Sequence, residues 1–402
     1  MRGKGFSEFK AMKEVTPKKR ILIVAGEVSG DLYAGSLIDV LKERGDFEIF
    51  AVGGPQTRKR DVTLLYDSSH WAAIGYVEAI KQAPRLLMVL KELRRFLAEK
   101  RPDLLLLVDY PGFNMRLTRR ARKLGIPTLY YFPPSKFAKN PNDIADAAKN
   151  ISLVAANFTF TYDVYKAAGA NVKFVGHPLL DISKPSMSKQ EAFAAFGLDP
   201  KRPVIGLCPG SRRSEIELLL QVMLDAGKIL WEKRPDLQFL VPVISTKSSE
   251  VYGVPKKVLN QQLKSSGIPV KLVEGHIYDV MAISDILLIS SGTATLEACL
   301  IGTPMVIVYR VSLFTEIMAK LFNKLPKFIG LPNIILDKMV IPELIQRDLT
   351  PDNLAKKAFS LLTNHSAKEA QKLELASVIN HLGEPGANSK VADLALKLLG
   401  KS

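Results

Sequence analysis

One segment, residues 286–310, restricts the fold of this chain more than any other. Its first residues, 286–289, are an apolar run with the length and composition of a buried parallel strand. A turn at residues 290–293 and a helical stretch follow, until Gly302-Thr303-Pro304 stops the helix before a second apolar run at 305–309. This order predicts a strand–helix–strand unit of a parallel sheet.

The turn of this unit is a candidate phosphate site. Ser291, Gly292 and Thr293 open the predicted helix, and free N–H groups together with the positive end of the helix dipole can hold an anion there. Glu297 follows about one turn later and is placed to reach a ribose hydroxyl. An ordinary unit in which Thr293 or a neighbour merely caps the helix fits equally well, so both interpretations stay open.

The length and the two cysteines bound the class of protein. A chain of 402 residues suggests two domains of ordinary size. Cys208 and Cys299 lie in apolar sequence without metal-ligand spacing, so we predict buried thiols in a reducing compartment and no metal site. No apolar run reaches the roughly 18–20 residues of a membrane span, and the charged start lacks the apolar core of a signal peptide.

The formal net charge of +16 favours an anionic partner, whether anionic lipid, phosphorylated substrate or nucleic acid. No basic stripe interleaved with stacking aromatics is present, nor a zinc or helix-turn-helix pattern, so we predict no nucleic-acid partner. The alternative is that the charges are spread over solvated faces.

Strand and helix patterns alternate through two successive halves. Residues 1–19 are a basic lead-in, residues 20–181 a first domain, and residues 182–402 a second domain with three helices over 351–400. Strands are predicted at 21–27, 47–52, 62–66, 104–110, 128–132, 151–156 and 172–175, and then at 204–208, 238–243, 270–273, 286–289 and 305–309. Residues 71–100 are predicted as two helices split near Pro84. The expected fold is α/β: two doubly wound Rossmann-like domains facing a cleft.

Four side chains of the first half are candidates for acid–base chemistry. Asp109 ends a strongly apolar strand, where it suits catalysis or helix capping. Glu27 and Asp31 lie in the small-residue turn after the first strand, at the edge where open α/β sheets bind ligands. His177 precedes a proline at the junction of the domains, and ligand contact and hinge packing both fit it.

The second half offers a second anion site. Gly210, Ser211 and Arg212 follow the strand at 204–208 and combine backbone N–H groups with a guanidinium fork. Ser214 and Glu217 stand three residues apart, which predicts a capping box at the start of the next helix.

Residues 313–328 carry an apolar stripe with a basic edge. Phe314 and Met318 belong to the stripe, and Lys320 and Lys324 belong to the edge. The pattern is typical of a helix that lies on an anionic membrane surface. Core packing or a dimer contact is the alternative.

Taken in order, these motifs resemble the lipid-A-disaccharide synthase family of inverting glycosyltransferases, which have the two-Rossmann-domain (GT-B) architecture. The resemblance spans roughly residues 21–362. It rests on Gly26-Glu27 with Ser29-Gly30-Asp31, Asp109 with Asn114, Gly176-His177-Pro178, Pro209-Gly210-Ser211-Arg212, the segment 291–297, Leu331-Pro332-Asn333, and Pro342-Glu343-Leu344 with Gln346.

The resemblance implies a hexosyltransferase that needs no cofactor or metal. It would transfer diacylglucosamine from UDP-2,3-diacylglucosamine to 2,3-diacylglucosamine 1-phosphate, an anionic lipid, giving lipid A disaccharide 1-phosphate and UDP. Such an enzyme would act in the cytoplasm as a peripheral protein of the inner membrane of a Gram-negative-type bacterium, with a homodimer as one option. Asp109 would be the base, with Glu27, Asp31 and His177 as further candidates. The expected UDP ligands are Gly210, Ser211, Arg212, Ser291, Gly292, Thr293, Glu297, Asn333 and Gln346.

The sequence departs from the family pattern at two places on the acceptor side. Residues 133–139 hold no tryptophan where the family has Ser-Pro-Ser followed by Trp-Ala-Trp, and Gly112 stands where a second aspartate is common. A glycosyltransferase with a different lipid acceptor is therefore one alternative. A UDP-sugar 2-epimerase of the same architecture and a non-catalytic, membrane-bound sensor of nucleotide sugars are the others.

Overall fold

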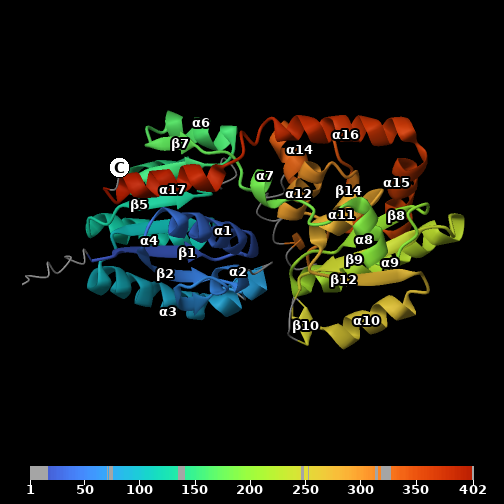
Figure 1. Cartoon of the computed structure of the whole chain (residues 1–402), viewed down its shortest axis with the longest axis horizontal. Coiled ribbons are helices and arrows are strands. Elements are labelled where there is room, and N and C mark those ends of the chain that lie inside the picture. Colours follow the sequence, from blue (N-terminus) through green and yellow to red (C-terminus); the bar gives the residue numbers. More distant parts are fainter. Residues whose placement is uncertain are drawn as a thin grey trace, which may run out of the picture.

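The computed structural model describes residues 17–69, 71, 76–134, 141–245, 249–251, 253–312, 316–317 and 327–400. Within these ranges the chain forms two halves, each built on a parallel sheet with helices on both faces (Figure 1). The strand orders are β3-β2-β1-β4-β5-β6-β7 in the first sheet and β12-β9-β8-β13-β14-β15 in the second. The predicted pair of Rossmann-like domains is confirmed.

The first half contains all seven strands that the sequence predicts, each within two residues of its predicted ends. The strands are β1 (Lys19–Ala25), β2 (Phe47–Gly53), β3 (Thr63–Asp67), β4 (Leu104–Val108), β5 (Thr128–Tyr131), β6 (Leu153–Ala156) and β7 (Val172–Phe174). The helices are α1 (Val28–Arg44), α2 (Pro55–Arg58), α3 (Tyr76–Lys100), α4 (Pro111–Lys123), α5 (Pro141–Asn150) and α6 (Thr159–Ala167).

The predicted split near Pro84 is wrong, because α3 continues through this proline. A proline inside a helix costs about 3 kcal/mol, since it removes a hydrogen bond and crowds the preceding turn. Burial against the sheet offsets this cost, at about 1.5–3 kcal/mol for each large apolar side chain. The buried side chains on this face of α3 are Val89, Leu90, Leu93 and Leu97.

The second half repeats the architecture. Its sheet consists of β8 (Val204–Cys208), β9 (Gln238–Val243), β12 (Val270–Glu274), β13 (Ile286–Ser290), β14 (Met305–Tyr309) and β15 (Glu343–Ile345), and β10 (Glu250–Val251) with β11 (Val254–Pro255) forms a separate hairpin. The helices that follow β7 along the chain are α7 (Leu179–Ile182), α8 (Lys189–Ala195), α9 (Arg213–Lys233), α10 (Lys256–Ser265), α11 (Ile277–Ile283), α12 (Thr293–Ile301), α14 (Leu331–Leu336), the short 3₁₀ helix η1 (Gln346–Asp348), α15 (Pro351–Thr363), α16 (His365–Ile379) and α17 (Ala387–Leu398). The predicted unit β13–α12–β14 and the three final helices are confirmed.

The chain passes between the halves twice. After α16 it returns to the first half, where α17 lies beside α1 and β5 (Figure 1). The Tyr131 hydroxyl donates to Asn388 Oδ1 over 3.0 Å, and Asn388 Nδ2 donates to Ser36 Oγ over 2.8 Å. The division at residue 182 stays a prediction, and the structure adds that α17 packs on the first sheet.

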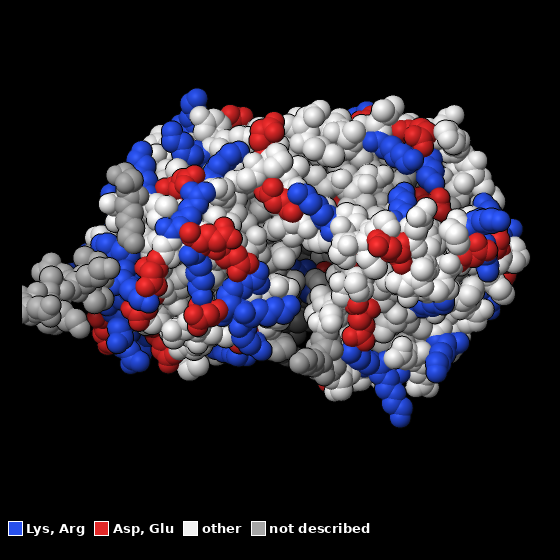
Figure 2. Space-filling view, in the orientation of Figure 1, with Lys and Arg blue, Asp and Glu red and all other residues white. Residues whose placement is uncertain are grey.

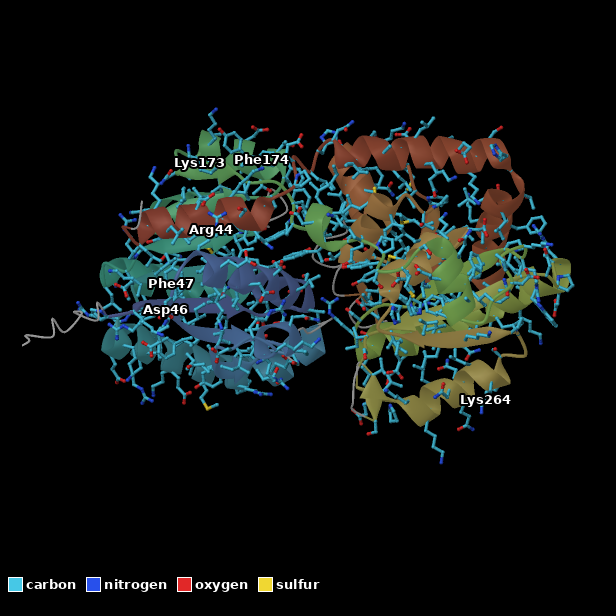
Figure 3. All side chains as sticks on the ribbon, viewed as in Figure 1. Arg44, Asp46, Phe47, Lys173, Phe174 and Lys264 are labelled. Carbon is cyan, nitrogen blue, oxygen red and sulfur yellow. The ribbon has the colours of Figure 1, made fainter. Side chains whose placement is uncertain are left out.

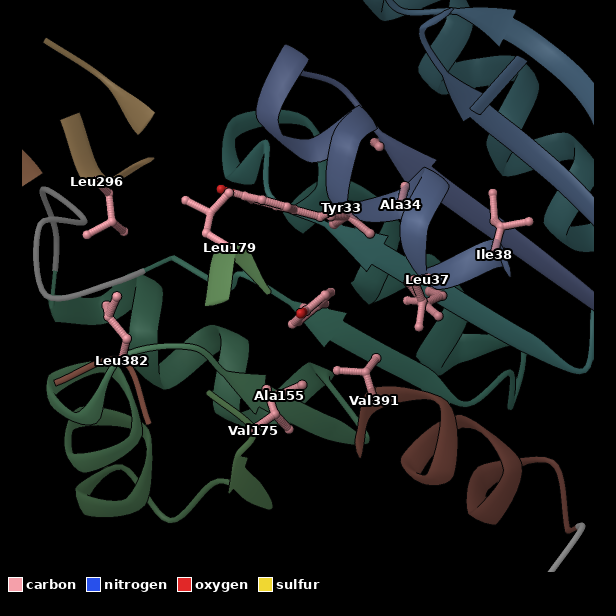
Figure 4. Packing of buried hydrophobic residues seen from close by; sticks show 14 of the residues in the cluster. Tyr33, Ala34, Leu37, Ile38, Ala155, Val175, Leu179, Leu296, Leu382 and Val391 are labelled. Carbon is pink, nitrogen blue, oxygen red and sulfur yellow. The ribbon is translucent and has the colours of Figure 1, made fainter. Parts of the chain in front are cut away.

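The two crossings lie against each other. The backbone N–H of His177 donates to Leu382 O over 2.9 Å. Gly176 has φ +85°, and a Cβ there would lie 2.8 Å from Glu384 O, so a side chain at this position has neither the conformation nor the space. Around the crossing, one apolar cluster joins both halves, and Figure 4 shows its members Tyr33, Leu179, Leu296, Leu382 and Val391.

Candidate active site

Each sheet reverses its strand order between two neighbours, β1 beside β4 in the first sheet and β8 beside β13 in the second. The loops that leave such a pair diverge to opposite faces, which opens a crevice at the carboxyl edge of the sheet. Glu27 and Asp109 follow β1 and β4, whereas Arg212 and Thr293 follow β8 and β13. Figure 2 shows a hollow between the two halves. The structure therefore brings the predicted loops to the two reversal points.

Asp109 lies in a strained turn directly after β4. Asp109 and Tyr110 are both left-handed, with φ of +53° and +51°, and such residues each cost about 1–3 kcal/mol. Three hydrogen bonds hold the turn. The Asp109 N–H donates to Tyr131 O over 3.0 Å, and its carbonyl accepts from Asn114 Nδ2 over 2.7 Å and from the Tyr130 hydroxyl over 2.9 Å. The backbone of this carboxylate is thus fixed from three sides.

The surroundings of Asp109 favour proton transfer near neutral pH. Burial raises the pKa of its carboxyl to about 7, and the negative charge of Glu27 adds to the effect. Hydrogen bonds from the Tyr110 backbone and the Ser29 side chain, and the positive charge of Arg212, act in the opposite direction. A carboxyl with a pKa near 7 can accept a proton and release it again at the pH of the cell.

Arg212 pairs with one carboxylate from each half. Its Nη2 lies 3.2 Å from Glu27 Oε2, and its Nη1 lies 2.9 Å from Glu215 Oε1. Burial opposes the charged form, but Glu215 and Glu27 hold the pKa of Arg212 above its ordinary value. Its Nε is buried and has no hydrogen-bond partner in the described part of the chain. The structure therefore presents a charged guanidinium between the halves with hydrogen-bonding capacity to spare.

The carboxylate of Glu215 fills the turn that was predicted to bind an anion. It accepts from the N–H groups of Ser211 and Arg212 over 2.8 and 3.2 Å. Gly210 has φ +120°, and a Cβ there would lie 2.1 Å from Glu215 Oε2, so glycine is required. Two backbone donors of this turn are already occupied, and the guanidinium remains as its anion-binding group.

The capping box predicted from Ser214 and Glu217 is wrong. Helix α9 begins at Arg213, one residue before Ser214, so Ser214 is inside the helix. Glu215 takes the third helical position and accepts the N–H groups of the turn, while Glu217 pairs with Arg213 over 2.7 Å. Serine spacing alone did not reveal that a buried glutamate performs the capping.

Helix α12 begins at the reversal point of the second sheet. Its N-cap is Gly292, and no side chain caps it, so the alternative in which Thr293 or a neighbour caps the helix is wrong. The Ser291 hydroxyl donates to Ile329 O over 2.7 Å, and the Thr295 hydroxyl donates to Gly292 O over 2.7 Å. The first N–H groups of a helix have no acceptor within it, which leaves the phosphate interpretation of this turn as a prediction.

Glu297 lies within α12 and, like Asp109, has a carboxyl with a raised pKa. Burial raises its pKa to about 7. The Tyr278 hydroxyl donates to Glu297 Oε1 over 3.1 Å. Near neutral pH this carboxyl can both donate and accept, which suits a pair of vicinal sugar hydroxyls.

Tyr33 is a residue of this region that the sequence analysis did not find. It lies on α1, is 2% exposed, and stacks on Phe132 with ring centroids 4.3 Å apart. Burial raises its pKa well above the ordinary value, the charges of Glu297 and Asp109 add to this, and a hydrogen bond with Thr293 opposes it. Tyr33 thus reaches from the first half to Thr293 at the start of α12. In the sequence, Tyr33 stands among apolar residues of a predicted helix, which indicates only a core residue.

Two of the four acid–base candidates, Asp31 and His177, form contacts that stabilise the fold. The Asp31 carboxylate accepts from the N–H groups of Gly54, Gln56 and Thr57 over 2.7, 2.7 and 2.9 Å, and so fixes the loop after β2.

His177 is 1% exposed, and burial lowers its pKa to about 3. Its Nδ1 accepts from the Leu179 N–H over 3.2 Å. Its ring packs against Tyr33, Phe132 and Phe158. Such a histidine remains neutral at the hinge, so the geometry favours the packing interpretation over ligand contact.

The resemblance assigned Asn333 and Gln346 to UDP, but their side-chain amides form hydrogen bonds with neighbouring groups of the chain. Asn333 Nδ2 donates to Ile341 O and Glu343 Oε1, and its Oδ1 accepts from the Ile341 N–H over 2.9 Å. Gln346 Oε1 accepts from the Val311 N–H over 2.6 Å. In the structure both amides hold loops beside the second sheet.

Several predictions depend on residues outside the described ranges. Phe314, Met318, Lys320 and Lys324 all lie there, so the membrane helix stays a prediction. Among the described residues, no helix combines the length and apolar character needed to cross a membrane. The same residues contain no group of three or more His, Cys, Asp or Glu side chains that could hold a metal ion. Cys208 and Cys299 are buried free thiols.

The fold and its paired reversal points define an α/β protein of the two-Rossmann-domain (GT-B) class. Among solved structures, the UDP-GlcNAc 2-epimerase from Neisseria meningitidis bound to UDP-GlcNAc has a TM-score of 0.64 at 16% identity, over 94% of this chain and 100% of that one. The UDP-GlcNAc 2-epimerase from Methanocaldococcus jannaschii has a TM-score of 0.56 at 14% identity, over 94% of this chain and 99% of that one. At such identities the likeness shows the fold alone.

Sequence comparison goes further. The family described as lipid-A-disaccharide synthetase matches residues 21–397. Lipid-A-disaccharide synthases from Geobacter sulfurreducens, Nitrosococcus oceani and Myxococcus xanthus are 39%, 37% and 35% identical, over 95%, 94% and 96% of this chain and 98%, 96% and 99% of their own lengths. The chain belongs to the lipid-A-disaccharide synthase family and is a hexosyltransferase of lipid A biosynthesis. The resemblance is confirmed, and these relatives favour the transferase over the 2-epimerase alternative.

Proposed function

We propose that the enzyme transfers 2,3-diacylglucosamine from UDP-2,3-diacylglucosamine to 2,3-diacylglucosamine 1-phosphate in the region between the two sheets, with Asp109 as the base. One observation carries the assignment: a carboxyl with a pKa of about 7 lies at the first reversal point, within the electrostatic influence of Arg212 from the second. Inverting transfer from a nucleoside diphosphate sugar requires a proton acceptor and a cation for the leaving group.

The donor would bind the second half. The guanidinium of Arg212 exchanges its contact with Glu27, an ion pair 3.2 Å long, for the diphosphate oxygens. The start of α12, with Ser291, Gly292 and Thr293, contributes its dipole to the same phosphates. Glu297 contacts the ribose hydroxyls. Gly210 and Ser211 shape the turn, and Asn333 and Gln346 support the loops around it.

The reaction itself is an in-line displacement. The acceptor 6-hydroxyl attacks the anomeric carbon, its proton passes to Asp109, and the bond between that carbon and the β-phosphate oxygen breaks. The leaving UDP carries the resulting negative charge, which Arg212 stabilises. Attack opposite to the leaving group inverts the anomeric configuration. A positioned base accelerates such a step by about 10²–10⁴-fold.

The lipid partners account for the basic charge of the chain. Both substrates carry acyl chains and phosphate, and a net charge of +16 favours an anionic membrane surface. We place the enzyme at the cytoplasmic face of the inner membrane as a peripheral protein. Docking through residues 313–328, including Phe314, Met318, Lys320 and Lys324, and assembly as a homodimer are parts of the same proposal.

The test separates the transferase from its alternatives. Purified protein is incubated with the UDP-sugar lipid alone, with the acceptor lipid alone, and with both, and released UDP and the mass of the lipid product are measured. We expect UDP and a disaccharide phosphate only when both substrates are present. UDP release without acceptor would indicate a hydrolase, and sugar epimerisation without UDP loss would indicate an epimerase.

A further inference from the structure

The proposed displacement assigns no step to Glu27, although this residue lies in a rigid part of the site. Glu27 directly precedes α1, and its carbonyl accepts the Asp31 N–H over 2.8 Å. A Cβ on Gly26 would lie 2.1 Å from Tyr110 Cδ1, so the Tyr110 ring packs directly on the loop before Glu27. The backbone of Glu27 is therefore fixed beside the turn of Asp109, and its side chain is the part that can move.

Two carboxylates share the guanidinium of Arg212, and they hold it unequally. The Glu215 side chain is 5% exposed, accepts from Arg212 Nη1 over 2.9 Å, and also accepts from the N–H groups of Ser211 and Arg212. The Glu27 side chain is 32% exposed and does not cap α1. Within the described part of the chain it accepts one hydrogen bond, from Arg212 Nη2 over 3.2 Å. Glu27 is therefore the partner that an incoming anion can displace, whereas Glu215 keeps Arg212 in place.

The negative charge of Glu27 also acts on the turn that carries the base. Burial is the main cause of the raised pKa of Asp109, the charge of Glu27 adds to it, and the charge of Arg212 opposes it. Tyr110 shows the same influence, because burial and then the charge of Glu27 raise its pKa to about 12. The ion pair with Arg212 offsets the charge of Glu27, so loss of this pair exposes Asp109 to a stronger negative field.

The charges that can change at Asp109 belong to this one ion pair. Burial raises the pKa of each tyrosine hydroxyl near Asp109 above its ordinary value, so these hydroxyls are neutral near pH 7. Within the described part of the chain, the ionisable groups that face Asp109 are Glu27 after β1, Tyr33 on α1, Tyr110 beside it, Tyr130 on β5 and Arg212 before α9.

We propose that Glu27 is a positioning residue that holds Arg212 before the donor binds, yields it to the diphosphate of the nucleotide sugar, and then directs its unpaired charge at Asp109. The inference rests on the proposed function, because it takes Arg212 as the ligand of the diphosphate and Asp109 as the base. Donor binding thereby strengthens the base when the leaving group is in place. The same contact lowers the affinity for UDP, because the donor has to break it.

The first test measures UDP affinity by titration calorimetry on the full chain. Glu27→Gln keeps the size of the side chain and removes its charge, so UDP should bind about five-fold more tightly. Asp46→Asn is the matched control, since it removes one negative charge from an exposed site of the first half, on the side away from the second half (Figure 3). This control should change UDP affinity by less than about two-fold. Melting temperature checks folding, and Glu27→Ala is a second variant with the same expected sign.

Repulsion between Glu27 and UDP would also tighten binding in Glu27→Gln, and Arg212 separates the two causes. In an Arg212→Ala background the gain from Glu27→Gln should fall below about two-fold, because no guanidinium is left to release. An equal gain in both backgrounds would show simple repulsion, and no gain in either would show that Glu27 does not compete. Both results overturn the inference and leave the proposed function intact. Unchanged UDP affinity in Arg212→Ala alone would refute the donor assignment, and this inference with it.

The effect on Asp109 is measured as proton uptake. Because donor binding raises the proton affinity of this carboxyl, UDP binding at pH 7 should take up protons, which calorimetry in buffers of different ionisation enthalpy detects. Asp109→Asn supplies the baseline, since the protons of UDP itself still contribute there. The uptake above this baseline should fall in Glu27→Gln to about half of the wild-type value or less. Equal uptake in wild type and Glu27→Gln would show that Glu27 does not act on the base, and would overturn the inference.

Discussion

Replacing Asp109 by asparagine should inactivate the enzyme and also stabilise its fold. Asparagine preserves the shape of the side chain but cannot accept the proton, so we expect turnover to fall by about 10²-fold or more with UDP affinity nearly unchanged. The wild-type rate should rise with pH as the carboxyl, whose pKa is about 7, ionises. A second effect, on stability, follows from the same burial.

The sign of this second effect comes from the direction of the pKa shift. The folded pKa of Asp109, about 7, lies above the ordinary value of about 3.9. Below about pH 4 the carboxyl is neutral in both states, and between about pH 4 and 7 the folded protein binds the extra proton, so stability falls as pH rises. The whole shift corresponds to about 4 kcal/mol. Water at the half-buried carboxylate screens part of this, so we expect about 2 kcal/mol.

The Asp109→Asn variant should therefore be about 2 kcal/mol more stable than wild type at pH 8 and equally stable near pH 4. Urea unfolding can be followed through Trp71, whose ring packs 5.3 Å from that of Phe113, in a Trp231→Phe background that leaves one tryptophan. Asp103, at the other end of β4, provides a control of opposite sign. Burial opposes ionisation there, but hydrogen bonds from Arg20 and Lys19 leave its pKa below the ordinary value.

Asp103→Asn should accordingly destabilise the protein at neutral pH, by about 1 kcal/mol for the weakened hydrogen bonds, and the difference should shrink as pH falls through the carboxyl range. Equal stability of wild type and Asp109→Asn at pH 8 would refute the desolvation of Asp109. If Asp109→Asn is stabilised but has normal turnover, the raised pKa of Asp109 is supported and Asp109 is not the base.

Three other substitutions test the rest of the site. Arg212→Ala and Glu297→Ala should each weaken UDP binding by about ten- to a hundred-fold in calorimetry, and unchanged affinity would contradict the donor assignment. Gly210→Ala places a methyl group 2.1 Å from Glu215 Oε2, so UDP affinity and melting temperature should both fall; wild-type values would show that the turn can adjust. Asp31→Ala leaves three N–H groups unpaired and should cost at least about 2 kcal/mol in urea unfolding, whereas a variant of normal stability without activity would return Asp31 to the catalytic candidates.

The sequence predicted the sheets well because buried parallel strands are continuous apolar runs. Residues 104–108 and 286–289 have the length and composition of such strands, and their carboxyl ends correctly located Asp109 and the start of α12. The family motifs then supplied the activity. The helix break predicted at Pro84 was wrong, because tertiary packing of α3 outweighs the local cost of a proline in a helix.

What the sequence could not show is which polar groups satisfy one another. Glu215 reads as an ordinary helical glutamate, yet its carboxylate closes the turn of Gly210. The sequence ranked Asp109 first and kept Asp31 as a further candidate for the base. The structural difference between them is that three backbone amides bind the Asp31 carboxylate, whereas burial raises the pKa of Asp109 to about 7. Tyr33 became visible through contacts with residues more than ninety positions away.

The position of α17 has a consequence for synthesis of the chain on the ribosome. The surface of α1 and β5 that α17 covers belongs to residues translated about 250–350 positions earlier, which at 5–20 residues per second is roughly 12–70 s. Until then Tyr131 and Ser36 wait without Asn388, and the apolar groups around them are open to chaperones or to other chains. The half that is synthesised first is therefore completed last. Premature termination before residue 387 would leave the first half without α17.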